Sequence, residues 1–419
     1  MKRATAVLAG VAALALSWPW LRAGVAWPKV VVTQLDHCPQ LACDFALYYM
    51  PQIRLLHESP GEIVYGWVYP PLLAVLLQGL KLFSDAAAAQ IWTALNLGLT
   101  AGLTWMCYRR LPRGLAGALG AVALVSLSLP VLHALKWGQV SLLVVTLALA
   151  GLLRGGRVGG ALVGLAAAIK IYPAIFLALP LARRRLGEVG AGVVSGLLLG
   201  VAAPVMALGW SAAAPFYQRV LALQDVSVAG LGGQAVSASM FRWFVDGRHI
   251  ERVQRPLTDD SPLLLALPGE PAFAVILVFT VAGLAAWRLL DRRTSRATGA
   301  ALTLTAAGLA LPPGWHHYFV FLPFAQACVI GRGRLATGLG LASAAVAAAP
   351  ILALTERPEA YFEYSQAGGT TLAALLVFVA LVCVSPEGSD QQGGPLERSP
   401  DGQTPADSRD PQDRAAGTA

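Results

Sequence analysis

Hydrophobic runs recur along the chain from residue 4 to residue 384, and they are separated by short breaks rich in arginine, in proline and glycine, or in tryptophan and tyrosine. A helix needs about 20 apolar residues to cross the ~30 Å hydrocarbon core of a bilayer, and it satisfies every backbone polar group within its own segment. The pattern therefore predicts an all-α fold, a polytopic transmembrane bundle of about 12 helices.

The positions of the arginines predict which loops face the cytoplasm, because basic residues concentrate on that side of a membrane. Both termini are placed inside as well. The loops predicted to be cytoplasmic are 109–113, 154–157, 183–185, 291–296 and 332–334. The connections predicted to be outside are 23–68, 133–139, 170–173, 209–270, 312–317 and 355–369. The first and fourth of these, about 45 and 60 residues long, are too long to be simple connections.

Some hydrophobic stretches do not fit a simple span. The chain must cross the membrane an odd number of times between the outer loop that holds Asp44 and the cytoplasmic loop at Arg109, yet two apolar stretches, 69–84 and 86–107, lie between them. Residues 69–84 form a short stretch that begins with Pro70 and Pro71, so a half-buried or re-entrant element is predicted there. Residues 158–170 and 172–182 are also short and form either compressed helices or a re-entrant hairpin. The first run, 4–20, is interpreted as a retained signal anchor, with a cleaved signal peptide as the alternative.

Composition supports a membrane environment. The chain is 56% hydrophobic and 13% charged, with a mean hydropathy of +0.61, which is typical of membrane proteins. The net charge of +8 divides into +12 for residues 1–384 and −4 for residues 385–419. Basic loops beside helices account for the positive charge, so no nucleic-acid partner is predicted. The acidic, polar tail cannot bury a core and is predicted to be a disordered cytoplasmic extension of the membrane domain.

The five cysteines fall into two groups. Three lie in apolar segments, where a small buried thiol is the simplest interpretation: Cys107, Cys328 and Cys383. Cys38 and Cys43 share the first outer loop, and they are either bonded to each other or free.

Most ionisable residues lie at helix ends or in loops rather than in the middle of the apolar runs, which favours a catalytic or binding face at the outer interface over ion-coupled transport. The first outer loop contains Asp44, followed by Phe45, Tyr48 and Tyr49. A carboxylate beside aromatic residues at a membrane surface is a candidate general base toward a sugar or lipid hydroxyl. The alternative is an exposed loop carboxylate.

Other outer segments carry candidate ligands for an anion or a sugar. Lys136 and Lys170 either hold a phosphate or extend to the membrane interface, and Gln139 is a candidate partner for a sugar hydroxyl. The segment containing Lys136 and Gln139 is expected to open a helix at the outer face. Arg242, in the second large loop, either clamps a phosphate or is solvated.

The sequence Trp315-His316-His317 combines an indole with two imidazoles at the same predicted face. Histidine can donate to a phosphate oxygen or transfer a proton, and an indole can stack on a sugar. The alternative is an aromatic belt at the interface. No third ligand lies nearby in sequence, so a metal signal is weak, although a divalent metal is left open. No nucleotide-binding motif is present, and no cofactor is predicted.

Five elements in this order resemble glycosyltransferase family 87, over roughly residues 40–330. They are Asp44, Tyr69 to Leu72, Trp137 to Gln139, Ile169 to Pro173, and Trp315 to His317. The family includes mannosyltransferases that use polyprenyl-phosphate mannose, and it is similar to the GT-C class of membrane transferases.

The resemblance implies transfer of a hexose, with mannose favoured, from a polyprenyl-phosphate donor to a lipid or glycan acceptor. The reaction would invert the anomeric centre on the extracytoplasmic side of a bacterial plasma membrane. It implies that Asp44 is the catalytic base. It also makes either His316 or His317 a candidate for steering donor or acceptor. With the residues argued above, the predicted substrate-binding residues are His316, His317, Lys170, Gln139, Arg242, Tyr69 and Trp315.

One segment departs from the family pattern. Where members often show Asn-Gln-Ser, this chain has Gly233-Gln234-Ala235, with Arg242 downstream. This departure weakens the case for carrying over the sugar and the acceptor from the mycobacterial members of the family. The alternative functions are a transporter or flippase of a lipid-linked glycan or amphipathic solute, and a catalytically inactive relative.

Overall fold

A computed structural model of the chain describes residues 42–64, 67–222, 233–244, 272–291, 293–311, 314–353 and 360–384. Within these ranges the secondary structure is helical apart from one isolated bridge between Gly233 and Trp315, which confirms the all-α prediction. The predicted signal anchor, Cys38 and the predicted disordered tail lie outside the described residues.

The helices of the first half are η2 (Phe45–Tyr49), α3 (Met50–Glu58), α4 (Pro71–Leu76), η3 (Leu77–Leu82), α5 (Asp85–Tyr108), α6 (Leu115–Ser126), α7 (Leu129–Trp137), α8 (Ser141–Arg154), α9 (Gly156–Ile169), η4 (Tyr172–Leu177), α10 (Ala178–Ala182), α11 (Leu186–Leu197), η5 (Leu198–Ala202), α12 (Ala203–Leu208) and α13 (Trp210–Ala222). Those of the second half are α14 (Val236–Phe244), α16 (Ala272–Leu290), α17 (Arg296–Ala310), η7 (His316–Phe319), α18 (Leu322–Val329), α19 (Arg334–Ala353), α20 (Ala360–Gln366) and α21 (Gly369–Cys383). Of the η elements, η2 and η5 are π-helical and the others are 3₁₀.

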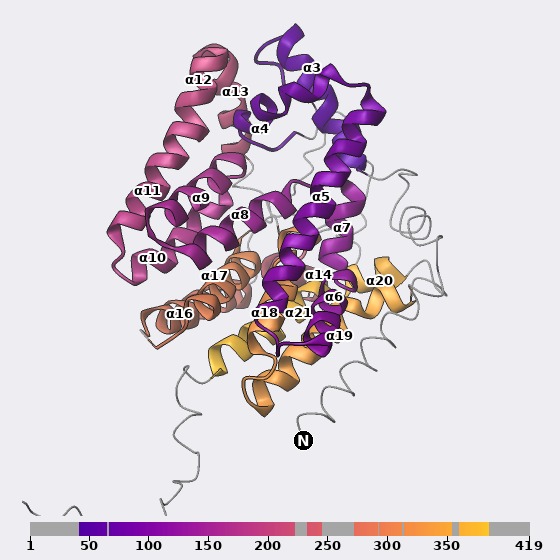
Figure 1. Cartoon of the computed structure of the whole chain (residues 1–419), viewed down its shortest axis with the longest axis vertical. Coiled ribbons are helices and arrows are strands. Elements are labelled where there is room, and N and C mark those ends of the chain that lie inside the picture. The colour runs from indigo at the N-terminus through magenta and orange to yellow at the C-terminus, as the bar shows by residue number, and fades with distance from the viewer. Residues whose placement is uncertain are drawn as a thin grey trace, which may run out of the picture.

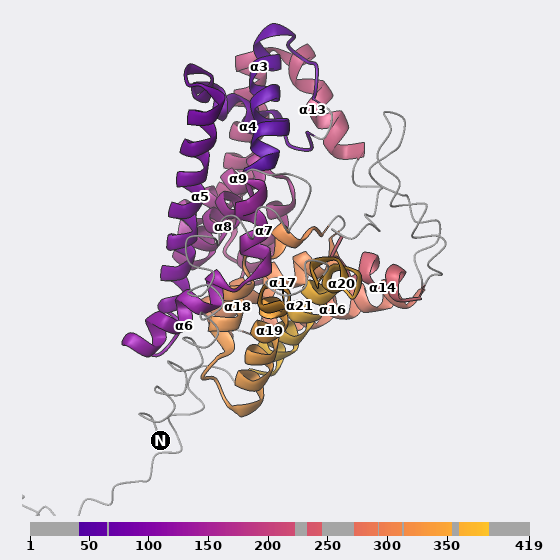
Figure 2. The same ribbon diagram turned by 90° about the vertical axis from the view of Figure 1, so that its right-hand side faces the viewer.

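The helices form an elongated bundle (Figure 1). In Figure 1, α8 to α12 lie on the left and α5 to α7 on the right, while α16 to α21 occupy the lower part. Figure 2 shows α3, α4 and α13 at one end, with α5 running along one edge toward α6. The predicted outer loops 23–68 and 209–270 are partly helical, because α3 lies within the first range and α13 and α14 lie within the second.

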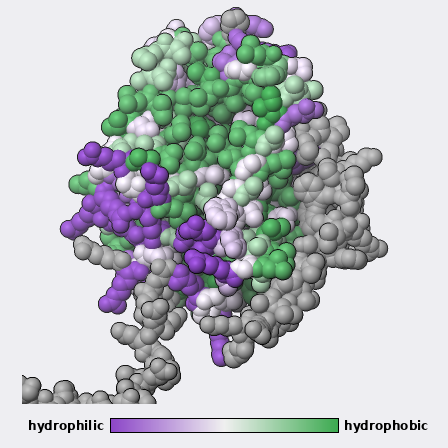
Figure 3. All heavy atoms as spheres, in the orientation of Figure 1, coloured by the Kyte–Doolittle hydropathy of each residue, from purple (hydrophilic) through white to green (hydrophobic). Residues whose placement is uncertain are grey.

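The surface carries large apolar side chains, as expected for a protein surrounded by lipid. Leu82, Met206 and Phe279 have exposed fractions of 82%, 84% and 71%. Figure 3 shows a broad hydrophobic surface over the upper part of one face, with hydrophilic residues gathered at its left and lower part. A soluble protein rarely exposes so wide an apolar area.

By length and composition, two helical segments of the described chain can cross a membrane, Leu186–Leu208 and Arg334–Ile351. A third candidate is the pair Leu115–Ser126 and Leu129–Trp137, which is bent by 56°. Several other apolar helices are shorter, so the predicted number of spans is not confirmed. The region predicted to be half-buried or re-entrant contains a six-residue α4 followed by a six-residue η3, which is too short to cross a ~30 Å hydrocarbon core.

Three of the predicted cytoplasmic loops meet at the buried carboxylate of Glu188. It accepts hydrogen bonds from the Arg296 guanidinium and, at 3.1 Å, from the backbone N–H of Gly156. Arg183 donates to the carbonyl of Thr294 at 2.5 Å. The loops containing Arg154 to Arg157, Arg183 to Arg185, and Asp291 to Arg296 therefore lie together at one end of the bundle, as their assignment to one side requires.

Helices α9 and α11 are held together by small residues. A Cβ added at Gly160 would lie 1.9 Å from the carbonyl oxygen of Glu188, and one at Gly164 would lie 2.2 Å from that of Gly192. Such close backbone contact is typical of packing between membrane helices, where small residues spaced four apart let two backbones approach. The short predicted segment 158–170 is thus an α-helix packed against α11.

A proline accounts for the π turn η5. Pro204 has no N–H group, so the carbonyl of Gly200, four residues earlier, lacks its usual helical partner. The hydroxyl of Tyr217 donates to this carbonyl instead, at 2.7 Å. This bond ties α13 to the end of the long α11–α12 helix.

Candidate functional site

Five of the predicted site residues come from separate helix ends and converge in one place. Asp44 lies just before η2, Tyr69 before α4, Gln139 between α7 and α8, Lys170 between α9 and η4, and His317 in η7. Apart from the half-buried Asp44, all are buried. The connections predicted to share the outer face thus supply one cluster of polar side chains.

Asp44 is held by a chain of hydrogen bonds. The Gln139 amide nitrogen donates to Oδ2 of Asp44. The Tyr69 hydroxyl donates to Gln139 Oε1 at 2.9 Å, and the Tyr49 hydroxyl donates to the Tyr69 hydroxyl at 2.9 Å. The chain begins at the backbone N–H of Val140, which donates to the Tyr49 hydroxyl at 3.3 Å.

The two ends of this chain fix its direction. A backbone N–H can only donate and an ionised carboxylate can only accept, so each hydroxyl and the amide between them have one compatible orientation. Turning the Gln139 amide by 180° would place its oxygen against the Asp44 carboxylate and lose the bond from Tyr69. The chain therefore orients Gln139 toward Asp44.

A glycine permits the contact between the Asp44 segment and the Gln139 turn. Gly138 has φ +64°, in the left-handed region, and a Cβ there would lie 2.7 Å from the Cα of Ala42. The Trp92 indole donates to the Gly138 carbonyl at 2.6 Å, and its rings stack on Phe45 at a centroid distance of 5.5 Å. The π turn η2 begins at Phe45, directly after Asp44, and such turns are frequent at functional sites.

The ammonium of Lys170 is enclosed by aromatic rings. Its Nζ lies 3.7 Å from the ring centroid of Tyr318, 5.4 Å from that of Tyr69 and 5.6 Å from that of Tyr172. It also donates to the Ser141 hydroxyl at 3.4 Å. Burial lowers the pKa of Lys170 well below its usual value, and the negative charge of Asp44 acts in the opposite direction. The lysine and the aspartate therefore interact electrostatically within one buried cluster.

The two adjacent histidines occupy different environments. Both ring nitrogens of His316 are hydrogen-bonded, Nδ1 with the Thr370 hydroxyl at 2.8 Å and Nε2 with the Ser365 hydroxyl at 2.9 Å. Nδ1 of His317 is buried and has no partner among the described residues. Burial lowers the pKa of His317 well below its usual value, and the charge of Lys170 lowers it further. His317 is thus neutral near pH 7.

The second large outer loop is joined to the histidine segment. The isolated bridge pairs Gly233 with Trp315, and the Gln234 side chain donates to the Ser365 carbonyl at 3.0 Å. The Trp315 ring stacks on His317 at 6.2 Å, with an interplanar angle of 13°. Arg242 lies in α14, but its side chain is outside the described part of the structure, so its predicted role stays a prediction.

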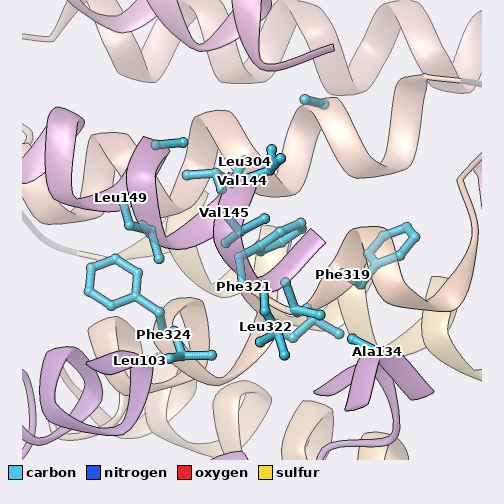
Figure 4. Close-up of a cluster of buried hydrophobic side chains, with 14 of the residues drawn as sticks. Leu103, Ala134, Val144, Val145, Leu149, Leu304, Phe319, Phe321, Leu322 and Phe324 are labelled. Carbon is cyan, nitrogen blue, oxygen red and sulfur yellow. The ribbon is translucent and has the colours of Figure 1, made fainter. Parts of the chain in front are cut away.

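A hydrophobic cluster supports these polar residues (Figure 4). It packs side chains of α5, α7, α8, α17, η7 and α18 together. Its labelled members are Leu103, Ala134, Val144, Val145, Leu149, Leu304, Phe319, Phe321, Leu322 and Phe324. Since His317 is two residues before Phe319 and Gln139 lies between α7 and α8, this packing fixes the backbone that carries them.

One local prediction is wrong. The segment from Lys136 to Gln139 was expected to open a helix, but Lys136 and Trp137 are the last residues of α7, and α8 begins at Ser141. The reason is the left-handed conformation of Gly138, which ends α7. Most of the predicted outer loop 133–139 is therefore helical.

Several residues of the cluster were not among the predicted site residues. They are Tyr49, His133, Ser141, Tyr172 and Tyr318. His133 lies in an apolar helix four residues before Trp137, a spacing that puts both side chains on one helix face. This shared face was the signal in the sequence that could have identified His133. Cys43, directly before Asp44, is disulfide-bonded, while Cys107, Cys328 and Cys383 are free. In the described ranges, no group of three or more His, Cys, Asp or Glu side chains is placed to hold a metal ion.

A helical bundle with apolar side chains on its surface and a buried acid–base cluster where its loops converge defines an integral membrane protein with an internal polar site. The chain belongs to glycosyltransferase family 87, whose model matches residues 67–313, more than half of its length. It is therefore a membrane glycosyltransferase that takes a sugar donor and an acceptor. No curated protein and no solved structure matches the chain.

Proposed function

We propose that this protein transfers a hexose, with mannose as the expected sugar, from a polyprenyl-phosphate donor to a lipid or glycan acceptor. The reaction takes place at the outer face of a bacterial plasma membrane, which the chain crosses about 12 times, and it inverts the anomeric centre. The observation that carries the proposal is that Asp44 and Lys170 belong to one polar cluster: Asp44 is linked through Gln139 to Tyr69, and the Lys170 ammonium lies 5.4 Å from the Tyr69 ring. The base can take the proton that the acceptor hydroxyl loses, and the cation can stabilise the negative charge on the phosphate that leaves.

The proposed mechanism is a single displacement. Asp44 takes the proton of the acceptor hydroxyl as the hydroxyl oxygen forms a bond to the anomeric carbon. The bond between that carbon and the phosphate oxygen breaks, and the phosphate leaves with the bonding electrons. Lys170 and His317 stabilise the charge on the departing phosphate, the first as a cation and the second as a neutral hydrogen-bond donor. Arg242 is a further candidate for this role.

The surroundings of Lys170 support its use as a phosphate ligand. Its ammonium is held over aromatic rings rather than in a direct ion pair among the described salt bridges. Burial disfavours the charged lysine, and a phosphate at the same place would restore a favourable environment for it. The ammonium of Lys170 is already removed from water in the free protein, so binding of the donor phosphate does not have to desolvate it again.

The contacts support different roles for the remaining candidates. Gln139 and Tyr69, which the sequence suggested as substrate ligands, hold Asp44 in place through the hydrogen-bond chain. His316 anchors its segment to α20 and α21, which leaves His317 as the better candidate for substrate contact. Trp315 is half-buried on the face of His317, where an indole could stack on the transferred sugar.

The experiment that tests the function is sugar transfer in membrane vesicles supplied with radiolabelled polyprenyl-phosphate mannose. Asp44→Asn and Asp44→Ala should decrease transfer by at least ~10²-fold, the usual effect of removing a general base. Asp85→Ala is the matched control, because Asp85 is an exposed carboxylate paired with Arg54 at 2.5 Å, and its transfer rate should equal that of the wild type.

Two outcomes would redirect the proposal. Transfer that survives both Asp44 substitutions would exclude this residue as the base, although not the enzyme class. If the wild-type protein transferred no polyprenyl-linked sugar but moved such a lipid across the vesicle membrane, independently of Asp44, the transporter or flippase alternative would replace the transferase.

A further inference from the structure

Buried polar atoms without a hydrogen-bond partner lie along a row of rings that reaches Lys170. In the described part of the chain they include Nδ1 of His133, Nε1 of Trp137, the hydroxyl of Tyr172 and Nδ1 of His317. The side chains of His133 and His317 are almost entirely enclosed, with exposed fractions of 5% and 6%. Folded proteins rarely leave such atoms unpaired, and several in one neighbourhood indicate a ligand that completes them.

The rings that carry these atoms form a continuous row. His133 stacks on His317 with a centroid distance of 5.6 Å and an interplanar angle of 23°, and it lies 6.0 Å from Trp137. His317 contacts Tyr318 at 5.0 Å, and Tyr318 stacks on Tyr172 at 5.1 Å. The ammonium of Lys170 lies over the Tyr318 ring. The row therefore runs from the end of α7 to the lysine proposed to bind phosphate.

The chemistry of the row matches an anion with many acceptor oxygens. Imidazole, indole and phenol groups can each donate an N–H or O–H, and an indole can only donate. The charged neighbours on this side are cationic, since Lys136 and Lys170 act electrostatically on His133 and His317 respectively. The carboxylate of Asp44 accepts a hydrogen bond from the Gln139 amide, and Asp44 is not among the groups that act electrostatically on His133 or His317. Both nitrogens of His316 are occupied, so it does not compete for the ligand.

We propose that His133 and Trp137 form, with His317, the binding site for the phosphate of the donor lipid. The inference rests on the proposed function, because it names where the phosphate of that donor lies. It assigns to α7 a direct contact with substrate, and it makes His133 a specificity-determining residue for a phosphate-linked lipid over an uncharged one.

A packing role for His133 makes a different prediction, and two substitutions separate the roles. His133→Phe keeps an aromatic ring of similar size, which can still stack on His317 and on Tyr361, but it removes the nitrogen. His133→Asn removes the ring but keeps a hydrogen-bonding group at the position of Nδ1. If His133 binds phosphate, the asparagine variant should perform better than the phenylalanine variant; if it only packs, the order should be reversed.

The test is binding of sugar-free polyprenyl phosphate to the purified full-length protein in lipid nanodiscs, with the uncharged polyprenol of equal length as the reference ligand. His133→Phe should raise the Kd for polyprenyl phosphate at least tenfold, which corresponds to ~1.4 kcal/mol, and leave the Kd for polyprenol unchanged. His133→Asn should retain most of the affinity. Trp137→Phe provides a second variant, and Trp105→Phe, an exposed indole on α5, is its matched control.

The outcomes separate this inference from the proposed function. Unchanged affinity for polyprenyl phosphate in His133→Phe and in Trp137→Phe would overturn the inference, while sugar transfer by the wild type would leave the proposed function intact. Loss of binding in His133→Asn with retention in His133→Phe would assign a packing role instead and also overturn it. A wild-type protein that neither binds polyprenyl phosphate nor transfers sugar would overturn both.

Discussion

Removing one hydroxyl tests whether the chain of hydrogen bonds positions Asp44. Tyr69→Phe deletes the group that donates to Gln139 at 2.9 Å and accepts from Tyr49 at 2.9 Å. The aromatic ring that lies 5.4 Å from the Lys170 ammonium remains. The change therefore interrupts the chain two bonds away from the carboxylate without altering its charge or the aromatic enclosure of the lysine.

The expected loss follows from the two bonds. A buried hydrogen bond between neutral groups contributes about 0.5–1.5 kcal/mol net, so the hydroxyl accounts for ~1–3 kcal/mol in total. Only the part that reaches Asp44 through the Gln139 amide affects the rate. We expect a loss of ~1–2 kcal/mol of transition-state stabilisation, which is a decrease in kcat of roughly 5- to 30-fold. The KM for the donor should change little.

The assay is a double-mutant cycle in steady-state sugar transfer. If Tyr69 acts through Gln139, then Tyr69→Phe should cost little once Gln139→Ala is present, because the transmitting group is already absent. Tyr217→Phe is the matched control: it also removes a hydroxyl that donates a hydrogen bond, in this case to the carbonyl of Gly200 at 2.7 Å, far along the chain from the cluster. Its kcat should equal that of the wild type.

Two results would refute the reasoning. Multiplicative effects of the Tyr69 and Gln139 substitutions would show that the two residues act independently. A rise in KM with unchanged kcat in Tyr69→Phe would show instead that its hydroxyl binds substrate, which is the role the sequence suggested.

Two further predictions concern packing and pH. Gly164→Ala should lower the thermal unfolding temperature in detergent, since its Cβ would meet the Gly192 carbonyl at 2.2 Å and overpacking costs ~1–3 kcal/mol; Gly190→Ala, with nothing within 4 Å, should not lower it, and equal melting of the two variants would contradict this account. The lowered pKa of Lys170 means that its charge is lost at a lower pH than that of an ordinary lysine. The alkaline decline of kcat/KM should therefore begin below the usual lysine range in the wild type and move to higher pH in Lys170→Arg; an unmoved decline would exclude Lys170 as its cause.

The helix ends beside the predicted cytoplasmic loops could be predicted from the sequence, because a charged side chain is costly inside the hydrocarbon and so marks a helix end. Arg109, Arg183 and Arg332 each follow the end of a helix, and Arg334 begins one. The convergence of Asp44 with the other candidates also agrees with their assignment to one face. The number of spans cannot be predicted as directly from the sequence, because a helix shorter than the thickness of the hydrocarbon core is recognised only in the folded bundle.

The division of roles within the site needed the structure. His316 and His317 are equivalent in sequence, but both ring nitrogens of His316 bond to hydroxyls of α20 and α21, while Nδ1 of His317 has no partner among the described residues. His133 itself was not recognised, because its apolar neighbours predict a buried helix face and nothing in the pattern marks one buried polar atom as unpaired.

The hydroxyls that hold His316, those of Ser365 and Thr370, belong to α20 and α21. A growing chain that has been translated as far as α18 already contains Asp44 and Lys170, but it lacks the groups that fix the histidine segment. We expect such a nascent protein to be inert until its last helices have left the ribosome and entered the bilayer. An incompletely translated chain therefore does not consume donor lipid. A premature stop codon before α20 should abolish sugar transfer even when the shortened chain inserts into the membrane.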